Sequence, residues 1–143
     1  GEARERAGHL LEMVGLSGFA NSYPYELSGG MQQRAAIARA LVHDPKLILM
    51  DEPFGALDAL TREKMNLELL RIWGESGKTI VFVTHGIQEA VFLGSRVVVL
   101  TAGPARMADN FLVDLPHPRS LDIKTTEVFG DYTRRIYKLL GME

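Results

Sequence analysis

The sequence predicts an α/β fold with a parallel β-sheet and flanking helices. Three short apolar runs have the length of buried strands: KLILM at 46–50, TIVFVT at 79–84 and RVVVL at 96–100. Segments with helical spacing of apolar residues lie between them, at 59–75 and 87–93. This alternation favours parallel strands joined by right-handed crossovers. Because the runs are continuously apolar, the strands are expected to be buried on both faces.

Further helices are expected towards both ends of the chain. Residues 3–14 carry apolar side chains at helical spacing, and a second helix is expected at 31–43. The pair Asp44-Pro45 ends the second helix, because proline disfavours the helical conformation in the residue before it. A turn and an edge hairpin follow the third strand, and residues 126–140 are expected to form a last amphipathic helix.

The composition limits the classes of function. The chain has 143 residues, 46% hydrophobic and 24% charged, which suits one globular domain with a moderate core. A net charge of −2 and the absence of a long basic run give no indication of nucleic acid as a partner. The chain has no cysteine, which excludes disulfides and thiolate metal sites. No apolar stretch approaches the roughly 18 residues of a membrane span.

Ser28, Gly29 and Gly30 stand directly before the second predicted helix. Serine is a preferred N-cap residue, and glycines let the backbone approach a ligand closely. Unpaired amides and the positive end of the helix dipole together favour a bound phosphate. The alternative is a plain capped helix that follows a Gly-Gly turn.

Asp51 and Glu52 directly follow the first predicted strand. Ligands of open parallel sheets bind at the carboxyl ends of the strands, so both carboxylates are well placed for chemistry. One can hold a magnesium ion, usually through its water shell, and the other can orient and deprotonate an attacking water. The alternative is a charged loop start in which Glu52 caps a local group.

His85 ends the next strand and is expected at the same sheet edge as Asp51 and Glu52, where it could contact a terminal phosphate. A structural role is the alternative for a lone histidine. Asp58 is a candidate cap for the helix that follows it. A Ser28–His85–Asp51 hydrolase is rejected, because the chain has no G-x-S-x-G elbow.

Four motifs in order resemble the second half of an ABC transporter ATPase domain: LSGGMQQR, LILMDEP, GALD and VTH. The resemblance covers essentially the whole chain, and details such as VDLPHPR are most similar to the ATPase subunits of nitrate, sulfonate and taurine importers. It implies an incomplete P-loop NTPase-like parallel sheet with flanking helices, plus part of the ABC helical subdomain. The resemblance divides the chain into a helical subdomain with the signature helix (1–43), an α/β core from Walker B to the switch histidine (44–100) and a C-terminal hairpin and helix (101–143).

The resemblance also implies the cofactors ATP and Mg²⁺ and a role for each matching residue. Asp51 would hold magnesium through water, Glu52 would be the catalytic base, and His85 would be the catalytic switch histidine. The remaining matches would contact ATP in trans across a dimer: Ser28, Gly29 and Gly30 as the signature motif and Asp58 as the D-loop residue. Two positions depart from the commonest pattern, since Met31 replaces a frequent glutamine and Gly86 replaces a usual aspartate.

No G-x-x-x-x-G-K-[ST] phosphate loop and no Q-loop segment occur in these residues, so the resemblance is to a C-terminal half. The expected function is that of an ATP-hydrolysing importer subunit for a small anion such as nitrate, an aliphatic sulfonate or taurine. This chain on its own is expected to be inactive. The implied partners are membrane permease subunits, a second ATPase subunit in a homodimer and, indirectly, a solute-binding protein, with a peripheral location on the cytoplasmic face of the membrane.

Two other functions are weighed against this one. A non-catalytic remnant or permease-docking module would keep only the binding surface of the helical subdomain. An ABC-type ATPase of DNA maintenance would share the same motifs, but it would need long heptad segments or a basic DNA-binding face, and the sequence has neither.

Overall fold

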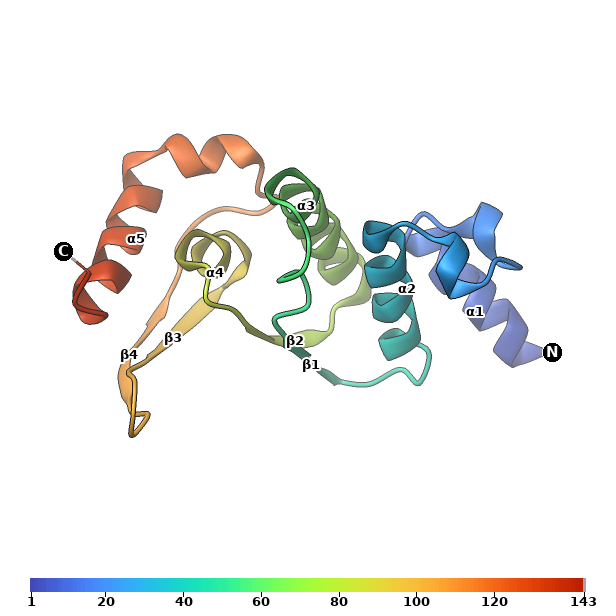
Figure 1. Cartoon of the computed structure of the whole chain (residues 1–143), viewed down its shortest axis with the longest axis horizontal. Coiled ribbons are helices and arrows are strands. Elements are labelled where there is room, and N and C mark those ends of the chain that lie inside the picture. Colours follow the sequence, from blue (N-terminus) through green and yellow to red (C-terminus); the bar gives the residue numbers. More distant parts are fainter. Residues whose placement is uncertain (143) are drawn as a thin grey trace. The chain divides into compact units, whose positions relative to one another are not determined.

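The computed structural model describes residues 1–142 (Figure 1). They form two compact units, which meet between Val83 and Thr84. Each unit contains one small sheet and its own helices. The α/β class is therefore confirmed. The three functional segments predicted from the sequence, with boundaries at 43/44 and 100/101, are not defined by compactness, so that division stays a prediction.

The first unit pairs two parallel strands and packs three helices. Its elements are α1 (Glu2–Met13), η1 (Ser17–Phe19), η2 (Pro24–Glu26), α2 (Gly29–Leu41), β1 (Leu47–Asp51), α3 (Ala59–Ser76) and β2 (Thr79–Val83). Helix α2 contacts both α1 and α3. Strands β1 and β2 pair in parallel, with Asp51 opposite Val83 at their carboxyl ends. The predicted parallel pairing of these strands is confirmed.

The ends of the helices follow their capping residues. Helix α2 begins two residues before the predicted start, because Ser28 is its N-cap and accepts a hydrogen bond from the Met31 amide at 3.3 Å. Helix α3 begins after its cap Asp58 and ends at Gly77, whose φ of 65° is left-handed. Glycine adopts this conformation without a steric penalty, which explains why the helix stops there.

The faces of β1 and β2 differ from the prediction of burial on both sides. Along β1, Ile48 and Met50 are 6% and 8% exposed, whereas Leu49 is 74% exposed. Val81 and Val83 of β2 are also about half exposed, at 47% and 50%. Continuous apolar runs are typical of strands with two covered faces, but the described residues cover only one face of β1 and β2.

The second unit contains an antiparallel hairpin and two α-helices. Its elements are α4 (Ile87–Leu93), β3 (Arg96–Leu100), β4 (Met107–Leu112), η3 (Leu121–Thr125) and α5 (Glu127–Leu139). The expectation of a separate edge hairpin after residue 100 is wrong: in the described part of the chain a single strand, β4, follows, and it pairs antiparallel with β3 itself. The expectation that 96–100 extends the parallel sheet is wrong, because the described strands form two separate sheets. A short turn brings β4 back beside β3, so this pairing is local and needs no crossover.

A buried arginine joins the end of α4 to the segment that follows β4. The Arg119 side chain lies inside the second unit, where the residue is only 5% exposed. Its guanidinium donates hydrogen bonds of 2.9 to 3.4 Å to backbone carbonyls, Nη1 to those of Val91, Phe92 and Gly94, and Nη2 to those of Val113 and Leu115. A cation is favourable at the C-terminal end of a helix, where carbonyl groups lack intrahelical partners.

Helix α5 packs its apolar side within the same unit. Thr126 caps it by accepting a hydrogen bond from the Phe129 amide, and Phe129 and Ile136 are buried. Tyr132 stacks on Phe111 of β4, with 5.8 Å between the ring centroids. Among the described residues, no helix combines the length and hydrophobicity needed to cross a membrane.

We predict that Arg119→Met lowers the free energy of unfolding by about 3 kcal/mol, because it leaves several buried carbonyls without a donor. Urea denaturation followed by circular dichroism measures the loss. The control is Arg134→Met, since Arg134 forms an exposed ion pair with Asp131 and its removal should cost about 0.5 kcal/mol or less. Equal unfolding midpoints for the two variants would contradict the structural role of Arg119.

Candidate functional site

The signature-like segment forms the start of α2 and lines an open cleft. Ser28 has an extended backbone, with φ −64° and ψ 165°, and Gly29 and Gly30 are the first two residues of the helix. A Cβ atom on Gly29 would lie 3.5 Å from the Leu57 side chain, and one on Gly30 would lie 3.5 Å from Thr61. These are ordinary contact distances, so the N-terminus of α2 packs against Leu57 and Thr61 at the start of α3.

Asp58 lies in the same cleft, which has a volume of about 750 Å³. Its carboxylate accepts hydrogen bonds from the Thr61 amide at 2.9 Å and from the Thr61 hydroxyl at 2.7 Å. These bonds hold the pKa of Asp58 below its ordinary value. The local cap considered from the sequence is thus present. The cleft also brings Asp58 together with Ser28, Gly29 and Gly30.

Two cationic side chains also line this cleft. Arg34 donates a hydrogen bond to the Val14 carbonyl at 3.1 Å, so it also supports the end of α1. Lys64 extends from an exposed position on α3. Neither residue was selected from the sequence. Arg34 is the last residue of the LSGGMQQR motif, which was its signal, and no sequence pattern singles out Lys64.

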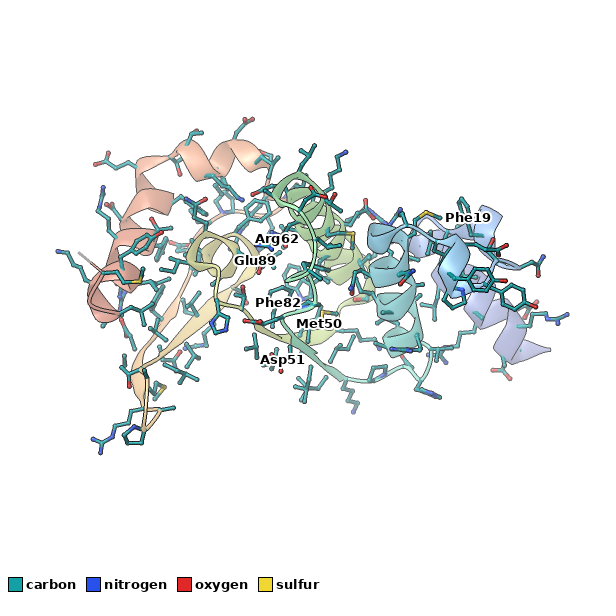
Figure 2. All side chains as sticks on the ribbon, in the orientation of Figure 1. Phe19, Met50, Asp51, Arg62, Phe82 and Glu89 are labelled. Atoms are coloured by element: carbon teal, nitrogen blue, oxygen red, sulfur yellow. The ribbon has the colours of Figure 1, made fainter. Side chains whose placement is uncertain are left out.

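The loop between Glu52 and Asp58 is held by one arginine of α3. Arg62 donates hydrogen bonds of 3.2 Å to three backbone carbonyls, those of Phe54, Gly55 and Leu57. The ring of Phe54 is fully buried and lies 5.7 Å from that of Phe82 on β2. The loop that leads from the two carboxylates to Asp58 is therefore fixed at several points. Figure 2 labels Arg62 and Phe82.

Asp51 and Glu52 lie at the carboxyl end of β1, as predicted. Asp51 is the last residue of the strand and is exposed (Figure 2). Glu52 has a φ of 44°, and its amide donates a hydrogen bond to the Val83 carbonyl at 2.8 Å. A non-glycine residue in the left-handed region is uncommon, and such strain concentrates at functional sites. Asp51 and Glu52 are not among the described residues that line the cleft around Ser28.

The metal-binding capacity of this strand end is limited but suits magnesium. The described residues contain no group of three or more histidine, aspartate or glutamate side chains that could hold a metal ion by themselves. Mg²⁺ commonly uses one or two carboxylates together with water and substrate phosphates. Asp51 and Glu52 supply such oxygen donors. The residues present therefore fit a magnesium ion that arrives with a nucleotide.

His85 lies in the second unit, in the segment 84–86 that leads from β2 to α4. The residues around it form a connected set of hydrogen bonds. The Thr84 hydroxyl donates to Glu89 Oε1 at 2.5 Å, and the Gly86 amide donates to Thr84 Oγ1 at 2.9 Å. Thr84 and Glu89 were not predicted from the sequence. Their signal was a threonine followed by a glutamate in the first turn of a helix, which resembles a capping pattern.

Comparison with known proteins agrees with the motifs. Residues 2–55 match the family model described as ABC transporter. An uncharacterized ABC transporter ATP-binding protein of Methanocaldococcus jannaschii is 52% identical over 142 residues, which are 99% of this chain and 52% of that protein. Over nearly its whole length the chain is similar to these ATP-binding proteins of ABC transporters, and its four ordered motifs agree with that similarity.

Other relatives carry more specific names. An aliphatic sulfonates import ATP-binding protein of Bacillus cereus is 46% identical over 133 residues, 93% of this chain and 52% of the relative. A taurine import ATP-binding protein of Pelagibacter ubique is 60% identical over 97 residues, 68% of this chain and 37% of the relative. The chain thus spans about half the length, or less, of the curated relatives it matches.

A solved structure supports the fold. The dimeric structure of a bacterial ABC transporter cassette matches with a TM-score of 0.60 and 44% identity, over 79% of this chain and 48% of that one. The chain therefore has the fold of part of such a cassette, and its α/β architecture is that of a partial P-loop NTPase.

The hydrogen bonds at Asp58 predict a pH dependence. Because its pKa is lowered in the folded chain, the stabilisation from this cap is present at neutral pH and is lost as the pH falls through the lowered pKa. Thr61→Val removes one donor, so we expect the pKa of Asp58 to rise towards its ordinary value. An NMR titration of the carboxyl carbon measures this. Thr125→Val, far from α3 in sequence, should leave Asp58 unchanged, and an ordinary pKa in the unaltered chain would contradict the prediction.

Proposed function

We propose that this chain is part of the ATP-hydrolysing subunit of an ABC importer. The observation that supports this most directly is the cleft in which Ser28, Gly29 and Gly30 lie together with Asp58. A helix start without side chains at two positions can offer amides and a positive dipole to a phosphate. The names of the relatives add the nucleotide and the transport function.

In this proposal each carboxylate at the end of β1 has one task. Asp51 takes part in holding Mg²⁺, which would neutralise phosphate charge when bound with ATP. Glu52 orients the attacking water and accepts its proton. The left-handed backbone of Glu52, together with the hydrogen bond from its amide to the Val83 carbonyl, fixes the backbone position from which this carboxylate extends. His85 contacts the terminal phosphate from the segment after β2.

The transported solute in this proposal is a small anion, an aliphatic sulfonate or taurine. The names of two relatives support this choice, and nitrate is the further candidate from the motif details. The partners are permease subunits in the membrane and a second ATP-binding subunit, whose ATP the Ser28 segment would contact across a dimer. A solute-binding protein would act through the permease. The subunit would lie peripherally on the cytoplasmic face of the membrane.

We predict that these 143 residues alone do not hydrolyse ATP, because they contain no G-x-x-x-x-G-K-[ST] loop to hold the phosphates. Calorimetric titration with ATP and magnesium should show no micromolar binding, and a phosphate-release assay should show no turnover. Clear binding would mean that the chain holds nucleotide by another route and would contradict this prediction. A non-catalytic docking module gives the same result, so the complete subunit is needed next.

In the complete subunit that carries these residues, we predict that Glu52→Gln lowers kcat by about 10²- to 10⁴-fold, as expected for loss of a general base. ATP affinity should change much less, since glutamine keeps the size of the side chain. Steady-state kinetics and nucleotide titration separate the two effects. Glu5→Gln, at an exposed position of α1, is the matched control. A kcat within about twofold of the unaltered subunit would show that Glu52 is not the base.

A further inference from the structure

Glu89 is connected to Thr84 directly, and through Thr84 to Gly86, the two neighbours of His85. It lies in the first turn of α4, where its Oε1 accepts a hydrogen bond from the Thr84 hydroxyl at 2.5 Å (Figure 2). The same hydroxyl oxygen accepts a hydrogen bond from the Gly86 amide at 2.9 Å. A hydroxyl has one proton, so its direction is set here: it donates to the carboxylate and accepts from the amide. His85 lies between the two bonded residues.

This arrangement is a capping box with one additional group. In the usual motif, a glutamate at the third helical position accepts directly from the backbone amide of the N-cap residue. Here the N-cap residue is Gly86, which has no side chain to cap the helix, and its amide reaches Glu89 through the Thr84 hydroxyl. We call this set of Gly86 amide, Thr84 hydroxyl and Glu89 carboxylate the Thr84–Glu89 relay.

The glycine at position 86 is matched to the relay. A Cβ atom there would lie 3.2 Å from Glu89 Cβ and 3.3 Å from Thr84 Oγ1, closer than most such contacts. Any larger residue would push against both partners of the short hydrogen bond. Gly86 stands where the ABC pattern usually has aspartate, and the relay gives a physical reason for glycine in this chain.

The second carboxylate oxygen is where the relay costs energy. Glu89 Oε2 is buried and has no hydrogen-bond partner among the described residues. Burying a charged oxygen without a donor is unfavourable, so the position needs a compensating reason. The relay offers one, because it fixes the backbone on both sides of His85.

We propose that Glu89 is a positioning residue for His85 and that it acts through Thr84. It holds the 84–86 turn so that the imidazole keeps one orientation. The importance of that orientation for ATP hydrolysis rests on the proposed function. The positioning itself does not depend on nucleotide, and it can be measured in this chain alone.

The test compares Thr84→Val, which removes the hydroxyl but keeps the shape, with Thr84→Ser, which keeps the hydroxyl. Two readouts are used: hydrogen exchange of the Gly86 amide, and the imidazole ¹⁵N signals of His85 across a pH titration. We expect Thr84→Val to speed Gly86 exchange about tenfold and to shift the His85 signals. Thr84→Ser should restore both. Glu89→Ala should resemble Thr84→Val, whereas Glu89→Gln, which keeps an acceptor oxygen, should lie between.

Histidines and a hydroxyl elsewhere in the chain provide the controls. His9 and His43 should keep their signals in every variant. The control variant Thr101→Val removes a hydroxyl from the β3–β4 turn and should leave Gly86 exchange and the His85 signals unchanged. If Thr84→Val leaves Gly86 and His85 unchanged, the proposal is wrong. If all histidine signals move together, or if Thr84→Ser behaves like Thr84→Val, the residues act on folding instead, and the proposal is also overturned. No nucleotide is present, so either result is independent of the proposed function.

Discussion

The buried guanidinium of Arg119 is the interaction on which the second unit depends. Helix α4 has only 7 residues, too few for a helix to be stable through its own hydrogen bonds. Arg119 supplies donors to the carbonyls at the C-terminal end of α4, and the Thr84–Glu89 relay supplies hydrogen bonds at its N-terminal end. A short helix is thus held at both ends by side chains, and the relay also holds the segment before it, which contains His85.

The first unit uses a similar arrangement at the starts of its helices. Ser28 and Asp58 each accept a hydrogen bond from the third amide of the helix they cap. Arg62 then fixes the carbonyls of the loop that leads to Asp58. Caps satisfy amides that have no partner within the helix, so the side chains that start a helix also order the loop before it. Stability and candidate function therefore depend on the same residues.

The sequence predicted best what depends on local chemistry. Periodicity located the helices, and Ser28 and Asp58 indicated where two of them begin, because capping involves residues within one turn. The pairing partners of a strand were harder to predict. The run RVVVL indicates a strand, but it does not show whether that strand pairs with β2 or with β4. The contacts of Arg119 could not be predicted from the sequence, since they join residues up to 28 positions apart. The exposed face of β1 was missed because an apolar run indicates which residues could be buried, not what covers them.

The backbone conformation of Glu52 departs from what the local sequence predicts, and the departure has a physical explanation. Nothing in DEPFG demands a left-handed glutamate, and a φ of 44° costs about 1 to 3 kcal/mol for such a residue. The structure compensates with backbone contacts: the Glu52 amide donates to the Val83 carbonyl, and the Glu52 carbonyl accepts from the Gly55 amide. Both contacts tie the residue to the parallel strand pair and to the loop that Arg62 holds. A glycine would relieve the strain but would remove the carboxylate, so the retained strain argues that the position of this carboxylate matters more than local stability.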